Sequence, residues 1–163
     1  MRSIAFVAVL ALLGCGEERA RRTTPTNLDI LSGFVVQSAT FTDAFVSGLR
    51  IELTDFPDYC ANAVETPLEA LPPAGIKLLF LEVDAQGVYK SARLIYRPSC
   101  TSEQGVSQPA TTGDVTVSDF RPAEIIAGTY SATFDGAATM GMFSAERCDR
   151  PDGWDLPTST RCD

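Results

Sequence analysis

The chain has 163 residues, of which 45% are hydrophobic and 21% are charged, a balance typical of one globular domain with a single core. It holds 13 basic and 21 acidic residues, for a formal net charge of −8, and this acidic balance argues against nucleic acid as a partner, because nucleic-acid binding needs clustered Lys and Arg. The sequence contains no histidine, which excludes Ser-His-Asp and Cys-His nucleophilic centres and every His-ligated metal.

Residues 1–14 have the pattern of a secretion signal. Arg2 is their only charged residue, and residues 4–13 form an unbroken apolar run. Ten apolar residues make a helix of roughly 15 Å, about half the hydrocarbon thickness of a bilayer. The run is therefore too short for a permanent membrane span and fits the apolar core of a signal peptide.

The end of this run, Leu12-Leu13-Gly14-Cys15, resembles the lipobox of bacterial lipoproteins, in which a small residue precedes the cysteine that receives diacylglycerol. The resemblance implies cleavage before Cys15 and anchoring of the mature protein to a membrane through acyl chains on that cysteine. Gly16, where aspartate would mark inner-membrane retention, resembles outer-membrane sorting, so we expect a location at the outer membrane of the cell envelope. The alternative is a conventional signal peptide followed by an unlipidated cysteine.

After cleavage the chain is expected to have two parts. Residues 15–27 begin with the lipid-bearing cysteine and are short of apolar side chains, which favours a flexible tether. Residues 28–163 form the expected β domain. Removing residues 1–14 takes away one basic and no acidic residue, so the net charge of the mature chain falls from −8 to −9.

The first predicted strands follow from hydrophobic patterning. Residues 34–41 are rich in β-branched and aromatic side chains. In residues 49–54, apolar side chains alternate with Arg50, Glu52 and Thr54, the period-two signature of a strand whose polar residues face outward. Residues 76–83 are nearly continuously apolar, which suits a central strand buried on both faces.

A hairpin is predicted next, since Asp84-Ala85-Gln86-Gly87 forms a credible tight turn into a strand at residues 88–96. Residues 98–113 read as a long polar loop. Helix is scarce: residues 61–71 allow one or two helical turns before Pro72-Pro73 stops them. The remaining predicted strands are residues 114–118, 125–134 and 140–146.

Regularly spaced short strands with turn signals between them predict an all-β fold. We expect one small antiparallel β-sandwich, or a partly open barrel, of about seven to eight strands.

Four cysteines remain once Cys15 is assigned to lipid: Cys60, Cys100, Cys148 and Cys162. In an exported chain an even set of cysteines predicts disulfides, here two, with three possible connectivities. The spacings of 40, 48 and 14 residues contain no C-x-x-C pair, so a zinc site has little support.

The C-terminal third also resembles a group of uncharacterised lipoproteins from myxobacteria and similar bacteria. The matching residues are 113–117, 128–134 and Gly141-Met142-Phe143-Ser144-Ala145 up to Cys148, with residues 53–60 as an earlier matching segment. The resemblance brings no known activity. It implies a β fold and a bridge between Cys60 and Cys148, which leaves Cys100 and Cys162 for each other. The competing arrangement is a local bridge from Cys148 to Cys162, closing a loop of about 14 residues.

The C-terminal tail holds the most suggestive polar cluster. Asp149, Asp152 and Asp155 are spaced by three residues around Gly153, and a flexible acidic loop of this kind is a weak calcium candidate. The spacing departs from the D-x-D-x-D-G arrangement and no Glu closes the loop, so a solvated acidic turn is the alternative. Trp154 offers a stacking surface for a sugar or a partner, or else folds back over the domain edge.

No catalytic motif is present, and the sequence therefore predicts a non-enzymatic protein without a cofactor. Residues 55–59 favour a turn rather than a site. We expect a binding, adhesion or structural interaction module at the envelope, with an extracellular or envelope protein or a glycan as partner. One alternative is a carboxylate-dependent hydrolase of envelope polymers, which needs a deep cleft with two inward acids. Another is a carrier of a lipid or other apolar ligand, which needs an unfilled apolar cavity inside a barrel.

Overall fold

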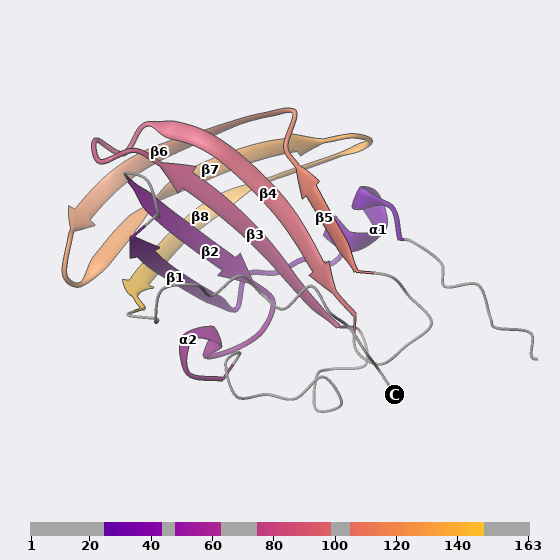
Figure 1. Cartoon of the computed structure of the whole chain (residues 1–163), viewed down its shortest axis with the longest axis horizontal. Helices are drawn as coiled ribbons and strands as arrows, with labels where there is room; N and C mark the ends of the chain where they lie inside the picture. Colours follow the sequence, from indigo (N-terminus) through magenta and orange to yellow (C-terminus); the bar gives the residue numbers. More distant parts are fainter. Residues whose placement is uncertain (1–24, 44–47, 63–74, 99–104, 149–163) are drawn as a thin grey trace, which may run out of the picture.

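The computed structural model describes residues 25–43, 48–62, 75–98 and 105–148. Within these ranges the chain forms two short helices and eight strands that belong to one sheet, with the spatial order β5-β4-β3-β2-β1-β8-β7-β6 (Figure 1). The elements are α1 Asn27–Leu31, β1 Ser38–Asp43, β2 Leu49–Thr54, α2 Tyr59–Asn62, β3 Ile76–Val83, β4 Tyr89–Arg97, β5 Val106–Pro109, β6 Thr112–Arg121, β7 Ile125–Phe134 and β8 Ala137–Arg147.

The sheet is mixed because its first and last strands run side by side in the same direction. Thr40 pairs with Glu146 and Phe41 with Arg147 in parallel register, whereas the other neighbouring strands pair antiparallel. The backbone N–H of Cys148 donates to the Phe41 carbonyl at 2.8 Å and extends this contact beyond β8. The contact joins the N-terminal meander β1–β5 to the C-terminal meander β6–β8.

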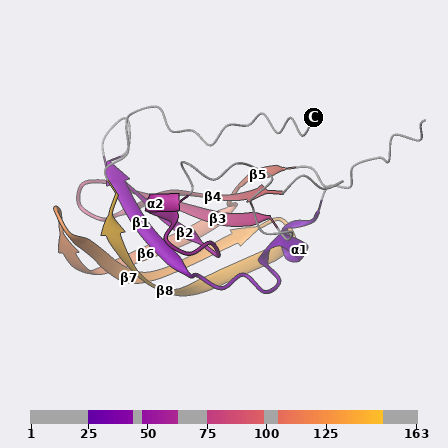
Figure 2. The ribbon, with the colours of Figure 1, turned by 90° about the horizontal axis from the view of Figure 1, so that it is seen from below.

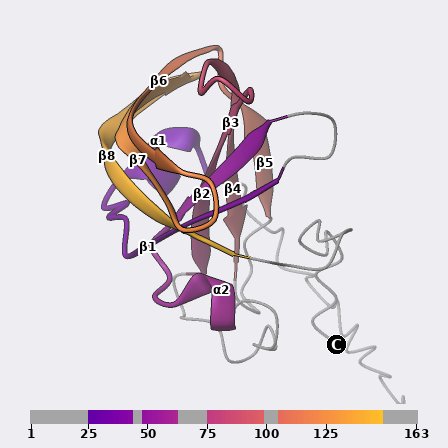
Figure 3. The ribbon, with the colours of Figure 1, turned by 90° about the vertical axis from the view of Figure 1, so that its left-hand side faces the viewer.

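The sheet curls into a half-barrel, as the end-on view in Figure 3 shows. Strands β2–β4 and β6–β8 lie on opposite sides of the interior in Figure 2, so one curled sheet produces a packing that resembles two layers. The all-β prediction with about eight strands and the partly open barrel are confirmed. The prediction of a wholly antiparallel sheet is wrong, because β1 and β8 pair in parallel, and this contact joins the two meanders into one continuous sheet.

The interior of the curl is filled by apolar side chains from all the long strands. Burying one such side chain stabilises a fold by roughly 1.5 to 3 kcal/mol, so this interior is the main source of stability. Helix α1 lies at one end of the curl and adds Ile30 to the interior (Figure 2). The fully buried members include Phe41, Ile51, Leu53, Leu79, Leu81, Leu94, Ile126, Phe134 and Ala145.

The two ends of the sheet approach each other where β5 leads into β6. The Ala110 N–H donates to the Ala92 carbonyl on one edge at 2.8 Å, and the Thr111 N–H donates to the Thr133 carbonyl on the other edge at 2.7 Å. A Cβ atom on Gly113 would lie 2.5 Å from the Tyr89 hydroxyl, so a larger residue at this point of β6 would have to displace the Tyr89 ring. The link between β5 and β6 therefore connects the two edges of the curled sheet.

The sequence-predicted hairpin is confirmed by the antiparallel pairing of β3 with β4. Its turn depends on Asp84, whose Oδ1 accepts the backbone N–H groups of Gln86 at 3.0 Å and Val88 at 2.9 Å. Gly87 has a φ of 82°, a left-handed conformation that glycine adopts without strain.

One predicted strand is shifted in the structure, and one predicted loop contains strands. The strand predicted at residues 34–41 begins at Ser38, and the loop predicted at 98–113 contains β5 and the start of β6. Strand β5 is a short, polar edge strand, which explains why it has no apolar signature. The helix prediction at 61–71 falls mostly on residues outside the described ranges, and α2 ends at Asn62.

The expectation that Glu52 and Thr54 face solvent is wrong, because both are buried on the outer face of the sheet. The chain after β2 turns back across this face and places Tyr59 against Ile76 and Leu78, which are buried in a second, smaller apolar cluster. The central strands are therefore covered on both faces. The alternation of apolar and polar residues along β2 indicated burial of the inner face alone.

Glu82, on the outer face of β3, gives the domain a pH-dependent contact. Burial alone would raise the pKa of Glu82, but hydrogen bonds from Ser91 (2.7 Å) and Arg50 (3.2 Å) outweigh it and hold the pKa below its ordinary value. For an acid with a lowered folded-state pKa, the stabilisation is present above the unfolded-state pKa and is lost as the pH falls through the folded-state value.

We therefore expect acidification from pH 7 to pH 3 to destabilise the wild type more than Glu82→Gln. The difference should be less than about 1 kcal/mol, since the pair is partly solvated. Urea unfolding at several pH values measures it, and Ser91→Ala should show an intermediate dependence. Equal pH dependence of all three proteins would contradict the role given to Glu82.

Candidate functional site

Most residues singled out from the sequence lie outside the described residues. They are Cys15, Cys100, Cys162, Asp149, Asp152, Asp155 and Trp154. Among the residues that are described, no group of three or more His, Cys, Asp or Glu side chains is arranged to hold a metal ion. Within the same ranges, neither helix has the length and hydropathy needed to cross a bilayer.

A disulfide joins Cys60 in α2 to Cys148 at the end of β8, with 5.8 Å between the Cα atoms. This is the pair that the resemblance to a group of uncharacterised lipoproteins implies, and it leaves no Cys148 thiol for a local bridge to Cys162. A second bridge is not seen, because Cys100 and Cys162 lie outside the described ranges. The observed bridge fixes α2 beside the parallel contact between β1 and β8.

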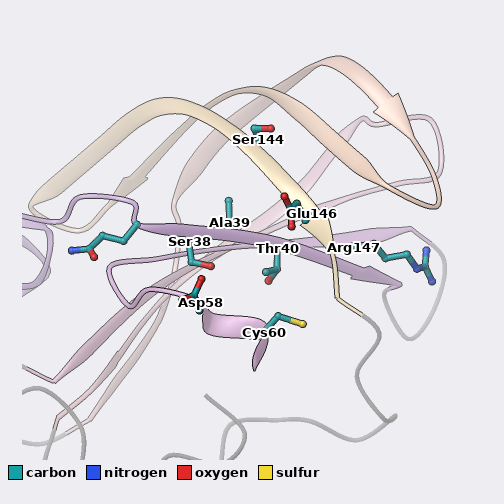
Figure 4. Close-up of a pocket in the computed structure, with 9 residues that line it drawn as sticks. Ser38, Ala39, Thr40, Asp58, Cys60, Ser144, Glu146 and Arg147 are labelled. Carbon is teal, nitrogen blue, oxygen red and sulfur yellow. The ribbon is translucent and has the colours of Figure 1, made fainter. Parts of the chain in front are cut away.

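An open polar pocket of about 510 Å³ lies beside this bridge (Figure 4). It is formed by the outer face of β1, the turn that leads into α2 and the end of β8. Its lining residues are Gln37, Ser38, Ala39, Thr40, Asp58, Cys60, Ser144, Glu146 and Arg147.

Local hydrogen bonds hold the turn between β2 and α2 in place. Asp55 Oδ1 accepts the Lys77 backbone N–H at 2.8 Å, and Ser38 Oγ accepts the Tyr59 backbone N–H at 3.3 Å. Burial raises the pKa of Asp55, although the hydrogen bond from Lys77 opposes this shift. Between these two anchors Asp58 has a φ of 49°, a left-handed conformation that aspartate tolerates better than most residues.

Thr40 is the most deeply buried polar residue of the lining, with 5% of its surface exposed. Its Oγ1 has no hydrogen-bond partner among the described residues. Figure 4 shows Ser38 and Thr40 on the same side of β1 as Asp58 and Cys60, whereas Ala39 points to the other side. A buried hydroxyl without a partner costs about 1 to 3 kcal/mol, so this group is a candidate to receive a ligand.

The pocket has an excess of negative charge. Asp58 and Glu146 are exposed carboxylates of the lining. Arg147, the one cation among the described residues of the lining, points away from the other side chains in Figure 4. Its Nη2 lies 2.7 Å from Asp43 Oδ2, and its guanidinium carbon lies 5.9 Å from the centre of the Phe41 ring. The charge of Arg147 is therefore matched by Asp43, outside the lining.

Comparison with protein-family models, with curated proteins and with solved structures found no match to this chain.

Sequence reasoning did not find this pocket. Residues 55–59 were interpreted as a turn, which is correct, but the turn also carries Asp58 into the lining. Thr40 and Glu146 lie far apart in the sequence, in the first and last described strands, and the parallel pairing of β1 with β8 brings them together. No local motif reports such a pairing.

Proposed function

We propose that this chain is a lipid-anchored protein of the bacterial cell envelope whose β domain acts as a binding module. The resemblance of Leu12-Leu13-Gly14-Cys15 to a lipobox supports the anchor. The Cys60–Cys148 bridge supports an oxidising compartment, because disulfides persist in exported proteins and are rare in the cytosol.

The observation that carries the binding role is the open pocket beside the bridge. Its polar groups are fixed in advance by a disulfide, by the parallel strand contact and by the Ser38–Tyr59 hydrogen bond. A preorganised site loses less conformational entropy when it takes up a ligand, which favours binding. The partner would be a molecule of the envelope or of the surroundings.

The two alternative functions gain less support. Asp58 and Glu146 are two carboxylates in one pocket, but both are exposed, whereas the hydrolase interpretation requires two inward acids in a deep cleft. A carrier of apolar ligands needs an unfilled interior, and the inner face of the half-barrel is packed with side chains.

Fractionation of cells tests the anchor. When the full chain is expressed in a Gram-negative host, we expect the wild type in the membrane fraction and Cys15→Ala in the soluble fraction, since the acyl chains supply the attachment. Intact mass of the extracted wild type should correspond to acylated residues 15–163. Cys162→Ala is the matched control and should stay with the membrane.

Three outcomes would contradict the proposal. A soluble wild type, or a membrane-bound Cys15→Ala, would remove the anchor. Release of soluble fragments from purified peptidoglycan by the wild type, but not by the Asp58→Asn/Glu146→Gln double variant, would favour the hydrolase over the binding module.

A further inference from the structure

We infer that the pocket beside the Cys60–Cys148 bridge binds a protonated primary amine, carried by a small molecule or by a lysine side chain. The inference rests on the proposed binding function and specifies the chemistry of its ligand. It depends on three properties of the pocket, which are its charge, its unpartnered hydroxyl and its size.

The charges that surround the pocket favour a cation. From the turn before α2 it receives Asp58, and from β8 it receives Glu146. Arg147, also from β8, is paired with Asp43 of β1.

The nearest cation on β2 is already engaged as well. Arg50 pairs with Glu82 at 3.2 Å and stacks on Phe80, with its guanidinium carbon 5.3 Å from the ring centre. The described carboxylates of the lining are thus left without a cation of their own. A ligand that brings positive charge would complete them.

Thr40 supplies the second, independent observation. Thr40 belongs to the lining of the pocket and has 5% of its surface exposed, and its buried Oγ1 has no hydrogen-bond partner among the described residues. An ammonium group has three N–H donors and no acceptor. Such a group satisfies a hydroxyl oxygen and carboxylates at the same time, which an anion or an apolar ligand does not.

The size of the pocket points to an organic cation. Its volume of about 510 Å³ falls within the range of small-molecule sites and far exceeds that of a bare ion. Calcium prefers several carboxylate ligands, but among the described residues no group of three or more Cys, Asp or Glu side chains is arranged to hold a metal ion, and the described lining supplies two carboxylates. An amine on an alkyl stem has the matching charge and dimensions.

The test uses the full mature chain extracted in detergent, with cadaverine as probe and 1,5-pentanediol as its neutral isostere, followed by calorimetry and NMR. We expect saturable binding of cadaverine that weakens as salt is raised, and no binding of pentanediol. Nα-acetyl-lysine methylamide is the third probe. Tighter binding of this compound than of cadaverine would identify a lysine side chain, and the reverse order a free amine.

Substitutions then locate the site. Asp58→Asn and Glu146→Gln should each weaken cadaverine binding about three- to fivefold, the effect of losing one partly solvated charge pair. The matched control, Asp114→Asn, removes an exposed carboxylate on β6 outside the lining and should leave affinity unchanged. Equal weakening by Asp114→Asn, or binding of pentanediol as tight as that of cadaverine, would overturn the inference.

Thr40→Val separates a ligand role from a structural one. The change keeps the shape of the side chain and removes the unpartnered hydroxyl, so the protein should unfold at the same or a higher urea concentration. Affinity for cadaverine should fall about threefold or more, the effect of one lost hydrogen bond. Loss of stability with unchanged affinity would contradict the role of Thr40.

The outcome is independent of the membrane anchor, because binding is measured on extracted protein. Failure of cadaverine to bind a protein that Cys15 holds on the membrane would overturn the amine inference alone. Binding of cadaverine by a protein that proves to be soluble would overturn the anchor alone.

Discussion

Removing the Cys60–Cys148 bridge with a Cys60→Ala/Cys148→Ala double variant is expected to lower the free energy of unfolding by about 4 to 5 kcal/mol. The bridge spans 88 residues, and in the chain-entropy model a longer loop removes more conformational freedom from the unfolded chain. A loss of this size is a large fraction of the total stability of a small domain. Urea unfolding, followed by circular dichroism, measures the difference.

The same double variant also tests for a second disulfide bridge. Adding reductant to the wild type should reproduce the loss caused by the double substitution. If Cys100 and Cys162 are also joined, reductant should destabilise the double variant further and free two thiols. A double variant as stable as the oxidised wild type would show that the bridge does not constrain the fold.

Leu81→Ala is expected to have the second large effect, a loss of about 3 to 5 kcal/mol in the free energy of unfolding. Leu81 lies on β3 at the centre of the interior with 0% of its surface exposed, so truncation removes buried methyl groups and leaves a cavity.

Leu28→Ala is the matched control for this prediction, since it makes the same chemical change on α1, where Leu28 is 62% exposed. Leucine and alanine have similar helix propensities, so Leu28→Ala should change stability by less than about 0.5 kcal/mol. Equal losses in the two variants would mean that the interior assigned to the half-barrel is wrong.

Three strands agree with the sequence in both position and length. Residues 49–54, 76–83 and 125–134 carry strong local signals, either alternation or a continuous apolar run, and their partners lie nearby in the chain. In a hairpin or meander the backbone hydrogen bonds of such strands are made with the next strand along the chain. The polar turn at Asp84 marks where the chain reverses.

Elements that depend on distant contacts were harder to predict. Strand β5 is polar and short, and it is a strand only because the edge of β4 is available to it. Helix α1 has a local signal that was overlooked, the capping box in which Thr26 and Asp29 exchange hydrogen bonds through side chain and backbone.

Local sequence patterns do not distinguish a sandwich from a half-barrel. Both folds bury one face of each strand, and they differ in how the first and last strands meet. That meeting is the pairing of Thr40 with Glu146 and Phe41 with Arg147, which no short motif encodes. The candidate pocket forms at the same contact between β1 and β8, so it could not be predicted from local sequence patterns either.

The junction of β1 with β8 also sets the order of events during biogenesis. Strand β1 is synthesised early, yet one of its edges has no neighbour until β8, the last described strand, has followed it. Contacts between such distant segments make folding slow and leave an unpaired edge open to aggregation. The described sheet is therefore complete only once β8 is available to pair with β1, and the Cys60–Cys148 bridge then locks a structure that the early half of the chain cannot finish alone.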